Sequence, residues 1–273
     1  MSEHTSSLGG QMDLEIYSRN NYNLYSPEHV HDHYEMYYLM SGQVKYFVDN
    51  KIFNLQAGDI IFIQKGLIHK TTYPGHQYNE RMLIVFDDEF LGQDYYEIVM
   101  DLGKQKYVRL PSKKQLEAEA LLKRIAEEFG SRDSHKNLMT KNLVRELLIL
   151  LHRQRQTETR KVLSDNEITM QHAAKYIADN YSDNLTLPSL AAAFAMSQSH
   201  FSKTFKALTG FGVTEYITLI RVTEAEKLLK SEHLSITEVA SRCGFNDSNY
   251  FASVFKKKNG ITPLKYSVIN RRE

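Results

Sequence analysis

The stretch GFNDSNYFASVFKKKNGITPLKY, from Gly244 to Tyr266, decides the fold of the C-terminal part of this chain. A glycine precedes a small polar cluster, a short amphipathic run and three consecutive lysines. Asp247 suits the N-cap of a helix, and Phe251 and Phe255 lie four residues apart, so they share one helical face. Gly244 suits a tight turn, because a left-handed backbone brings no Cβ clash in glycine. The stretch therefore predicts a turn followed by a helix with small polar residues at its start.

A second short helix is predicted immediately before this turn. Ser235-Ile-Thr-Glu238 has the spacing of a capping box, in which the two end side chains bond reciprocally to the backbone. The apolar face of this helix carries Ile236, Val239 and Ala240. Two short helices joined by a tight turn form a helix-turn-helix, whose second helix enters the major groove of DNA. The alternative is a plain helical hairpin with a solvated lysine run.

The same unit occurs twice in the chain. The segment SHFSKTFKALTGFGVTEY (199–216) aligns with NYFASVFKKKNGITPLKY (249–266). The matching pairs, each 50 residues apart, are Phe201 with Phe251, Phe205 with Phe255, Lys206 with Lys256, Gly210 with Gly260 and Tyr216 with Tyr266. Duplication of the whole unit favours a DNA-binding device over a plain helical hairpin.

These two copies resemble the DNA-binding region of the AraC/XylS family of bacterial transcription regulators. The motifs that carry the resemblance are Ile236-Thr-Glu-Val239-Ala240, Gly244-Phe245-Asn-Asp247, Tyr250-Phe251, Phe255-Lys256-Lys257 and Gly260-Ile-Thr262-Pro263-Leu-Lys-Tyr266. The chain departs from the family pattern at Asn249, Ser267 and Ala195, where serine, arginine and glycine are usual. The resemblance implies a joining helix from about Thr214 to Lys230, and two recognition helices that enter successive major grooves.

The resemblance also places the DNA-contacting residues. The residues expected to face bases are Ser199, Ser202 and Lys203 in the first copy, and Ser248, Asn249, Ala252 and Ser253 in the second. Asn can pair bidentately with adenine and Lys can bind guanine, so we expect Asn249 to suit adenine and Lys203 to suit guanine. The residues expected to hold phosphate without regard to sequence are Lys206, Lys256, Lys257 and Lys258.

Charge separates the two ends of the chain. Residues 1–110 hold 9 Lys/Arg and 15 Asp/Glu, whereas residues 168–273 hold 13 and 9. A chain of 273 residues has room for two domains. An acidic front and a mildly basic back indicate two domains with different tasks.

Three features predict a cytoplasmic protein. The single cysteine, Cys243, excludes an internal disulfide framework and suits a reducing compartment. The initial MSEHTSSLGGQMD has neither the basic nor the apolar region of a signal peptide. No uninterrupted apolar run approaches the roughly 18 residues of a membrane span, so we expect no membrane association.

Residues 1–110 are predicted to form a β-sandwich or a small β-barrel, because short runs rich in Tyr, Ile, Val and Phe follow one another without helical patterns between them. Residues 111–156 are predicted to be two amphipathic helices. Their apolar stripes are Leu116, Leu121, Ile125 and Phe129 in the first, and Leu143, Val144, Leu147, Leu148 and Leu151 in the second. These helices are expected to cover the barrel, to dimerise with a second chain, or both. Residues 157–167 read as a linker to the DNA-binding domain, 168–273.

The segment HVHDHYEMYYLMSG (29–42) is similar to the first motif of the cupin superfamily, and Gly58-Asp59…Gly66…His69 is similar to the second. The expected fold class is therefore α+β with two domains, a cupin-like jelly-roll barrel and an all-α C-terminal domain. On a strand, residues 29, 31, 33 and 35 project to one face. The side chains that could hold a divalent metal inside the barrel are His29, His31, Glu35 and His69.

The resemblance to the regulator family implies a sensor in place of an enzyme. The residues expected to bind a carbohydrate or another small organic effector are His31, Glu35, Tyr37, Tyr46 and His69, which combine aromatic faces with hydrogen-bonding groups. We expect a homodimeric activator with duplex DNA, an effector and RNA polymerase as partners, no catalytic residues and no obligatory cofactor. The alternatives are a metal-responsive regulator and a metal-dependent cupin enzyme fused to a DNA-binding domain.

Overall fold

The computed structural model describes residues 10–19, 30–73, 78–154, 163–231 and 233–270. The chain divides into two compact units, Met1–Val162 and Leu163–Glu273. His29, one of the predicted metal ligands, lies outside the described residues, as does most of the predicted linker.

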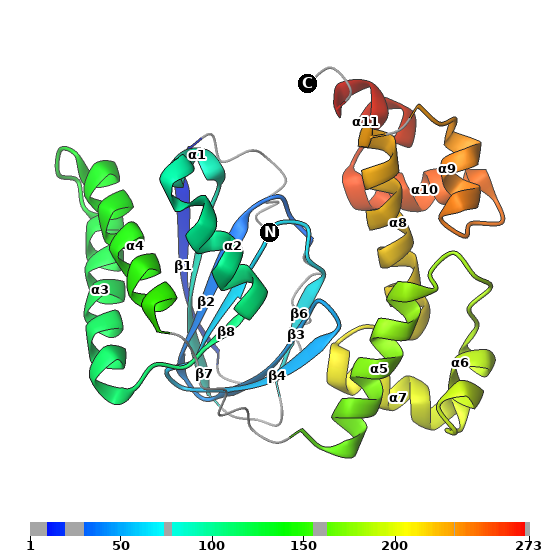
Figure 1. The fold of residues 1–273 in the computed structure, drawn as a ribbon, viewed down its shortest axis with the longest axis horizontal. Helices are drawn as coiled ribbons and strands as arrows, with labels where there is room; N and C mark the ends of the chain where they lie inside the picture. The colour runs from blue at the N-terminus through cyan, green and yellow to red at the C-terminus, as the bar shows by residue number, and fades with distance from the viewer. Residues whose placement is uncertain (1–9, 20–29, 74–77, 155–162, 232, 271–273) are drawn as a thin grey trace. The chain divides into compact units, whose positions relative to one another are not determined.

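The N-terminal unit is built on two antiparallel sheets, drawn in blue and cyan in Figure 1. Its strands are β1 (Met12–Arg19), β2 (Tyr34–Ser41), β3 (Gln43–Val48), β4 (Lys51–Gln56), β5 (Ile60–Ile63), β6 (His69–Thr72), β7 (Asn79–Phe86) and β8 (Tyr107–Val108). The larger sheet has the order β1-β7-β2-β5-β8 and the smaller has the order β4-β3-β6. Tyr37 and Leu39 from the larger sheet pack with Val44 and Tyr46 from the smaller, so one core lies between the sheets.

The prediction that no helices lie between the strands up to about residue 110 is wrong. Three short helical elements, α1 (Asp88–Leu91), η1 (Gln93–Tyr95) and α2 (Tyr96–Gln105), lie between β7 and β8. Asp87 caps α1 by accepting from the backbone N–H of Phe90. These helices are short, and only a few of their residues are apolar and buried, so their periodicity is hard to recognise in the sequence.

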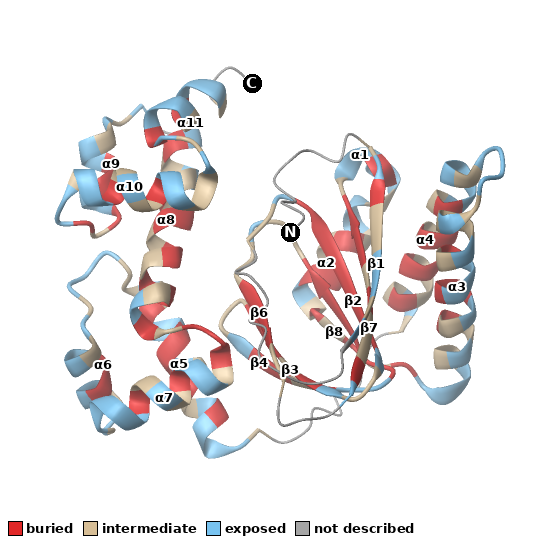
Figure 2. Cartoon of the chain, turned by 180° about the vertical axis from the view of Figure 1, so that it is seen from behind, coloured by how far each residue is buried: buried red, intermediate tan, exposed pale blue. Residues whose placement is uncertain are grey.

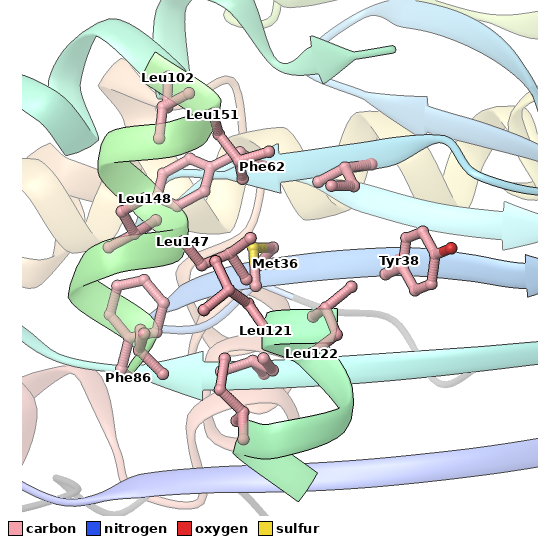
Figure 3. Packing of buried hydrophobic residues seen from close by; sticks show 14 of the residues in the cluster. Met36, Tyr38, Phe62, Phe86, Leu102, Leu121, Leu122, Leu147, Leu148 and Leu151 are labelled. Carbon is pink, nitrogen blue, oxygen red and sulfur yellow. The ribbon is translucent and has the colours of Figure 1, made fainter. Parts of the chain in front are cut away.

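Helices α3 (Ser112–Gly130) and α4 (Lys136–Arg153) pack against the outer face of the larger sheet. In Figure 3, Leu147, Leu148 and Leu151 of α4 lie close to Phe62 and Met36 of the sheet. All five predicted stripe residues of α4 are buried, which confirms that stripe. The stripe predicted for α3 is wrong at one position, because Leu116 is 68% exposed and Leu122 takes its place in the core.

The described residues of the C-terminal unit form helices and the turns that join them. Its helices are α5 (Asp165–Asp179), α6 (Leu187–Ala193), α7 (Gln198–Thr209), α8 (Val213–Ser231), α9 (Ile236–Arg242), α10 (Ser248–Asn259) and α11 (Pro263–Asn270). Helix α8 corresponds to the predicted joining helix, and buried residues line much of its length (Figure 2). Helix α5 begins inside the segment predicted as linker, because Ser164 and Glu167 form a capping box.

The two helix-turn-helix units, α6–α7 and α9–α10, share their local devices. The turns contain Ala195 and Gly244, with φ of 53° and 77°. Ala195 therefore has the left-handed backbone conformation that Gly244 has at the equivalent position of the second unit. Each second helix ends in a left-handed glycine and buries two phenylalanines completely: Gly210 with Phe201 and Phe205, and Gly260 with Phe251 and Phe255. The capping box predicted at Ser235 and Glu238 is present.

Candidate functional site

Helix α10 presents one polar face to solvent. The Asp247 side chain accepts from the backbone N–H groups of Asn249 and Tyr250 at 2.6 and 2.9 Å, which fixes the start of the helix. The exposed predicted residues are Asn249, Ser253, Lys256 and Lys257, and the half-buried ones are Ser248 and Ala252. Because Phe251 and Phe255 anchor the opposite face in the core, the polar face is held outward.

Helix α7 presents the equivalent face of the first unit. Its N-cap, Ser197, accepts from the backbone N–H of His200. The exposed predicted residues are Ser199, Lys203 and Lys206, and Ser202 is half-buried. The structure therefore places the predicted base-facing residues on the open faces of two equivalent helices.

Lys258, predicted to hold phosphate, also makes contacts within the C-terminal unit. Its Nζ lies 2.9 Å from Glu226 Oε1 and 3.0 Å from Thr223 Oγ1, both on α8. Asn259 also donates to Glu226 Oε1 at 2.8 Å. Lys258 thus ties the end of α10 to α8, a contact that the sequence does not reveal because the acid lies on another helix.

Arg221 of α8 is a positioning residue that no sequence motif indicates. Its guanidinium donates to the backbone carbonyls of Tyr181 and Asp183, both at 2.8 Å, and lies 5.8 Å from the ring centroid of Phe245. These contacts connect the loop after α5 with the turn of the second helix-turn-helix unit. That turn is therefore held by tertiary contacts as well as by its own glycine.

In the N-terminal unit, the five predicted effector-binding residues meet between the two sheets. We call them the inter-sheet polar cluster: His31, Glu35, Tyr37, Tyr46 and His69. Tyr46 donates to Glu35 Oε1 at 2.8 Å, whereas Glu35 Oε2 lies 3.0 Å from His31 Nε2 and 3.4 Å from His69 Nε2. The Tyr37 ring meets the Tyr46 ring edge-on, with centroids 4.9 Å apart. Glu35 is thus the centre of the cluster.

The other imidazole nitrogens of the cluster face backbone carbonyls. His31 Nδ1 lies 3.1 Å from the carbonyl oxygen of His33, and His69 Nδ1 lies 2.8 Å from that of Leu67. A carbonyl accepts only from a protonated nitrogen, so each Nδ1 carries hydrogen. Each Nε2 therefore either carries a second proton toward Glu35 or keeps a lone pair for a metal ion.

Three of the four predicted metal ligands lie together, and the fourth, His29, lies outside the described residues. Ligand atoms of His31, Glu35 and His69 all lie within 4.8 Å of one another. Three such ligands suit a transition-metal ion that keeps an open position. His33 does not join them, because residues 32–33 form a bend and β2 begins only at Tyr34, so strand alternation does not apply before that point.

Charge and burial together set the pKa values of this cluster. Burial raises the pKa of Glu35, but the charge of His69 and hydrogen bonds from both histidines outweigh it and hold that pKa well below its usual value. Burial lowers the pKa of His31, yet its bond and attraction to Glu35 leave that pKa raised. The cluster therefore favours an ionised Glu35 beside a protonated His31.

This pairing predicts a pH window for stability. Stabilisation by Glu35 is complete above its ordinary pKa of 4.5 and is lost as the pH falls through its lower folded value. Stabilisation by His31 is complete below its ordinary pKa of 6.5 and is lost as the pH rises through its higher folded value. Urea unfolding of wild type and Glu35→Gln should therefore differ most between pH 4.5 and 6.5. A difference that does not vary with pH would contradict this assignment.

A separate cavity of about 480 Å³ lies beside α1, η1 and α2, where Tyr34, Tyr95, Tyr96 and Asp88 line it. Asp88 is already paired with Lys65, whose Nζ lies 2.6 Å from its carboxylate. The Asp88 carboxylate in the lining of this cavity is thus already paired. The inter-sheet polar cluster, by contrast, brings together a carboxylate, two imidazoles and two phenols.

Two family models match this chain. An AraC-like ligand binding domain matches residues 11–162, and a helix-turn-helix domain matches residues 190–268. The first match alone covers more than half of the chain. This chain belongs to the AraC family of transcription regulators. The recognition from sequence is confirmed, and so is the two-domain fold class. The AraC-family chain is a DNA-binding transcription regulator with a ligand-binding domain.

Relatives of this AraC-family regulator are themselves named as regulators, not as enzymes. It is 24% identical over 243 residues to the HTH-type transcriptional activator RhaR of Yersinia pseudotuberculosis serotype O:3 (strain YPIII), covering 88% of this chain and 83% of the relative. It is 32% identical over 186 residues to the uncharacterized HTH-type transcriptional regulator YpdC of Escherichia coli (strain K12), covering 67% and 65%.

Solved structures similar to this AraC-family regulator include the C-terminal domain of AraT, a response regulator from Geobacillus stearothermophilus, with 34% identity and a TM-score of 0.37. That match covers 40% of this chain and 88% of the AraT domain. ToxT from Vibrio cholerae matches with 16% identity and a TM-score of 0.39, covering 95% of this chain and 98% of ToxT. Among the described residues, no helix combines the length and apolar character needed to cross a membrane.

Proposed function

We propose that this AraC-family regulator is a cytoplasmic activator that reads specific DNA sequences through α7 and α10 and responds to a small molecule in its N-terminal unit. The observation that carries the proposal is the pair of equivalent helices whose polar faces are exposed while their phenylalanines are buried. The activator role is supported by the name of the relative RhaR. Binding of the purified protein to promoter DNA tests the DNA-binding part of the proposal. Reporter transcription with purified protein and RNA polymerase tests the activator role.

On α7 and α10, two exposed lysines are expected to act differently. Lys203→Ala should relax sequence preference at one base pair, with a loss of about 1–3 kcal/mol of discrimination, because a lysine at a base edge reads guanine. Lys256→Ala should weaken binding to all sequences alike and reduce the slope of log affinity against log salt by about 1, because it loses a phosphate contact. Titrations against operator variants at several salt concentrations measure both. Identical behaviour of the two variants would contradict the separate roles.

The effector we propose is a carbohydrate or related metabolite bound at the inter-sheet polar cluster. The carboxylate and imidazoles of the cluster can hydrogen-bond to the hydroxyl groups of the effector, and the Tyr37 and Tyr46 rings can pack on the apolar face of a sugar. Binding would favour one arrangement of the regulator over another and so change its affinity for DNA. A thermal-shift screen of sugars on the full-length protein tests this, since a ligand that binds the folded state raises the unfolding midpoint.

A metal-responsive regulator is the second candidate, favoured by the ligand atoms of His31, Glu35 and His69 within 4.8 Å of one another. If a metal is the effector, chelation should remove it in stoichiometric amount and abolish the response at the promoter. His69→Gln should lower metal affinity at least tenfold. The exposed His200 on α7 provides the control, because His200→Gln should leave metal content unchanged. A purified protein without metal, whose response survives chelation, would contradict this candidate.

We also propose that the regulator acts as a homodimer through α3 and α4. These helices cover the larger sheet with one face, and Leu116 of α3 leaves a large apolar side chain exposed. Sedimentation of wild type and Leu116→Glu tests the proposal. A dimer that is unaffected by the substitution would place the contact elsewhere.

A further inference from the structure

A second group of polar side chains adjoins the inter-sheet polar cluster, around Arg81 of β7. Arg81 pairs with Leu39 of β2 on one side and with Tyr17 of β1 on the other. Its guanidinium carbon lies 5.6 Å from the ring centroid of Tyr37 and 5.5 Å from that of Tyr17. Because Tyr37 also contacts Tyr46, Arg81 continues the same polar region along the interior of the barrel.

Several buried atoms in this region have no hydrogen-bond partner among the described residues. They are Tyr37 Oη, Thr71 Oγ1 and Arg81 Nε. Thr71 lies opposite Tyr46 in the ladder between β3 and β6, and the Tyr46 ring contacts the Tyr37 ring, so Thr71 belongs to the same part of the barrel interior. Tyr37 is fully buried and Thr71 is 6% exposed, so bulk water does not readily serve them. Buried polar atoms are seldom left unpaired, which indicates that a ligand with several oxygens completes the site.

The charge of Arg81 narrows the class of ligand. The carboxylate that acts electrostatically on Arg81 is that of Glu35, whose ion pairs within the described residues are with His31 and His69 and not with Arg81. Glu35, the acid in the adjoining cluster, is engaged by Tyr46, His31 and His69. A guanidinium beside aromatic rings binds planar anions with two parallel hydrogen bonds, and a carboxylate balances its single charge.

We propose that the effector is a hydroxylated carboxylic acid, such as a sugar acid, and that Arg81 determines this specificity by binding its carboxylate. The hydroxyls of the ligand would bind Tyr37, Thr71 and the Glu35–histidine group. This inference rests on the proposed function, in which the inter-sheet polar cluster binds a carbohydrate-like effector.

The experiment measures thermal shifts and calorimetric affinities of the full-length protein with D-glucuronate, D-galacturonate and D-gluconate. D-Glucose, D-galactose and D-glucose 6-phosphate are the comparison ligands. At least one acid should bind saturably and at least tenfold more tightly than its neutral counterpart. Arg81→Gln should weaken the binding of that acid by about 10- to 100-fold, as expected for loss of a charge-assisted pair. The affinity of Arg81→Lys for the acid should lie between those of wild type and Arg81→Gln. Arg132→Gln, which changes an exposed arginine of the same unit, should bind the acid as tightly as wild type does.

Three results would overturn the inference, and they differ in what they say of the proposed function. Neutral sugars that bind wild type and Arg81→Gln equally would remove the role of Arg81 while leaving the effector site in place. Preference for the sugar phosphate would replace the carboxylate with a phosphoryl group. No saturable binding of any acid or neutral sugar to the folded protein would contradict the carbohydrate effector itself.

Discussion

Gly244→Ala is expected to abolish specific DNA binding and to destabilise the C-terminal unit by about 2–5 kcal/mol. Gly244 has a φ of 77°, and a Cβ at this position would lie 2.7 Å from the backbone oxygen of Ser182. The neighbouring backbone has little freedom to move aside, because Arg221 bonds to the carbonyls of Tyr181 and Asp183. Relief of the clash must therefore displace the turn that aims α10.

Gly260→Ala is the matched control. Gly260 has nearly the same backbone, with a φ of 72°, but a Cβ added there would meet no atom of the described residues within 4 Å. The substitution should cost only the left-handed strain, about 1–2 kcal/mol, and should retain DNA binding. Urea unfolding followed by circular dichroism, with fluorescence anisotropy on promoter DNA, measures both effects. Equal losses of unfolding free energy and of DNA affinity in the two variants would show that the contact with Ser182 is unimportant.

Arg109→Met is expected to destabilise the N-terminal unit by about 3 kcal/mol, the lower end of the range for breaking a buried ion pair. Asp59 is fully buried and accepts two bonds of 2.7 Å from Arg109, whose own side chain is 35% exposed. Without Arg109, the hydrogen bonds to the Asp59 carboxylate from described residues would be those of the Tyr107 hydroxyl and the backbone N–H of Gln56. The link between β5 and β8 should loosen as a result, since Asp59 directly precedes β5 and Arg109 directly follows β8.

The double variant Asp59→Asn with Arg109→Met separates charge from packing. It should recover part of the lost free energy of unfolding, because a neutral amide is cheaper to bury than an unpaired carboxylate. Urea denaturation of the two single variants and the double variant at neutral pH gives the coupling energy. Strictly additive losses would show that the ion pair is not the origin of the effect.

The sequence predicted the DNA-binding half well because its signals are local. The capping box of Ser235 and Glu238, the N-cap Asp247 and the buried pair Phe251 and Phe255 each involve residues within four positions of one another. Contacts between residues so close in the sequence produce the same sequence pattern whatever the rest of the fold is. The repeat at 50 residues then showed that the pattern occurs twice.

The front domain was predicted less completely because its contacts are distant in the sequence. The strands were recognised from their apolar runs, but α1 and α2 were missed, and the exposure of Leu116 depends on how α3 rolls against the sheet. Motif spacing pointed to His31, Glu35 and His69, and the structure brought them together. His33 is not among these ligand atoms, because it lies in a bend before β2 begins.

The amino-acid sequence by itself determined the family, the duplicated helix-turn-helix and the residues that face outward from α7 and α10, because helix caps and apolar spacing are short-range properties. Only the tertiary structure decided which charges meet. It joined Lys258 to Glu226, Arg109 to Asp59 and Arg81 to the tyrosines of the barrel interior. The reason is physical: strand pairing and helix packing bring together residues more than thirty positions apart, and nothing in their own neighbourhoods records the partner.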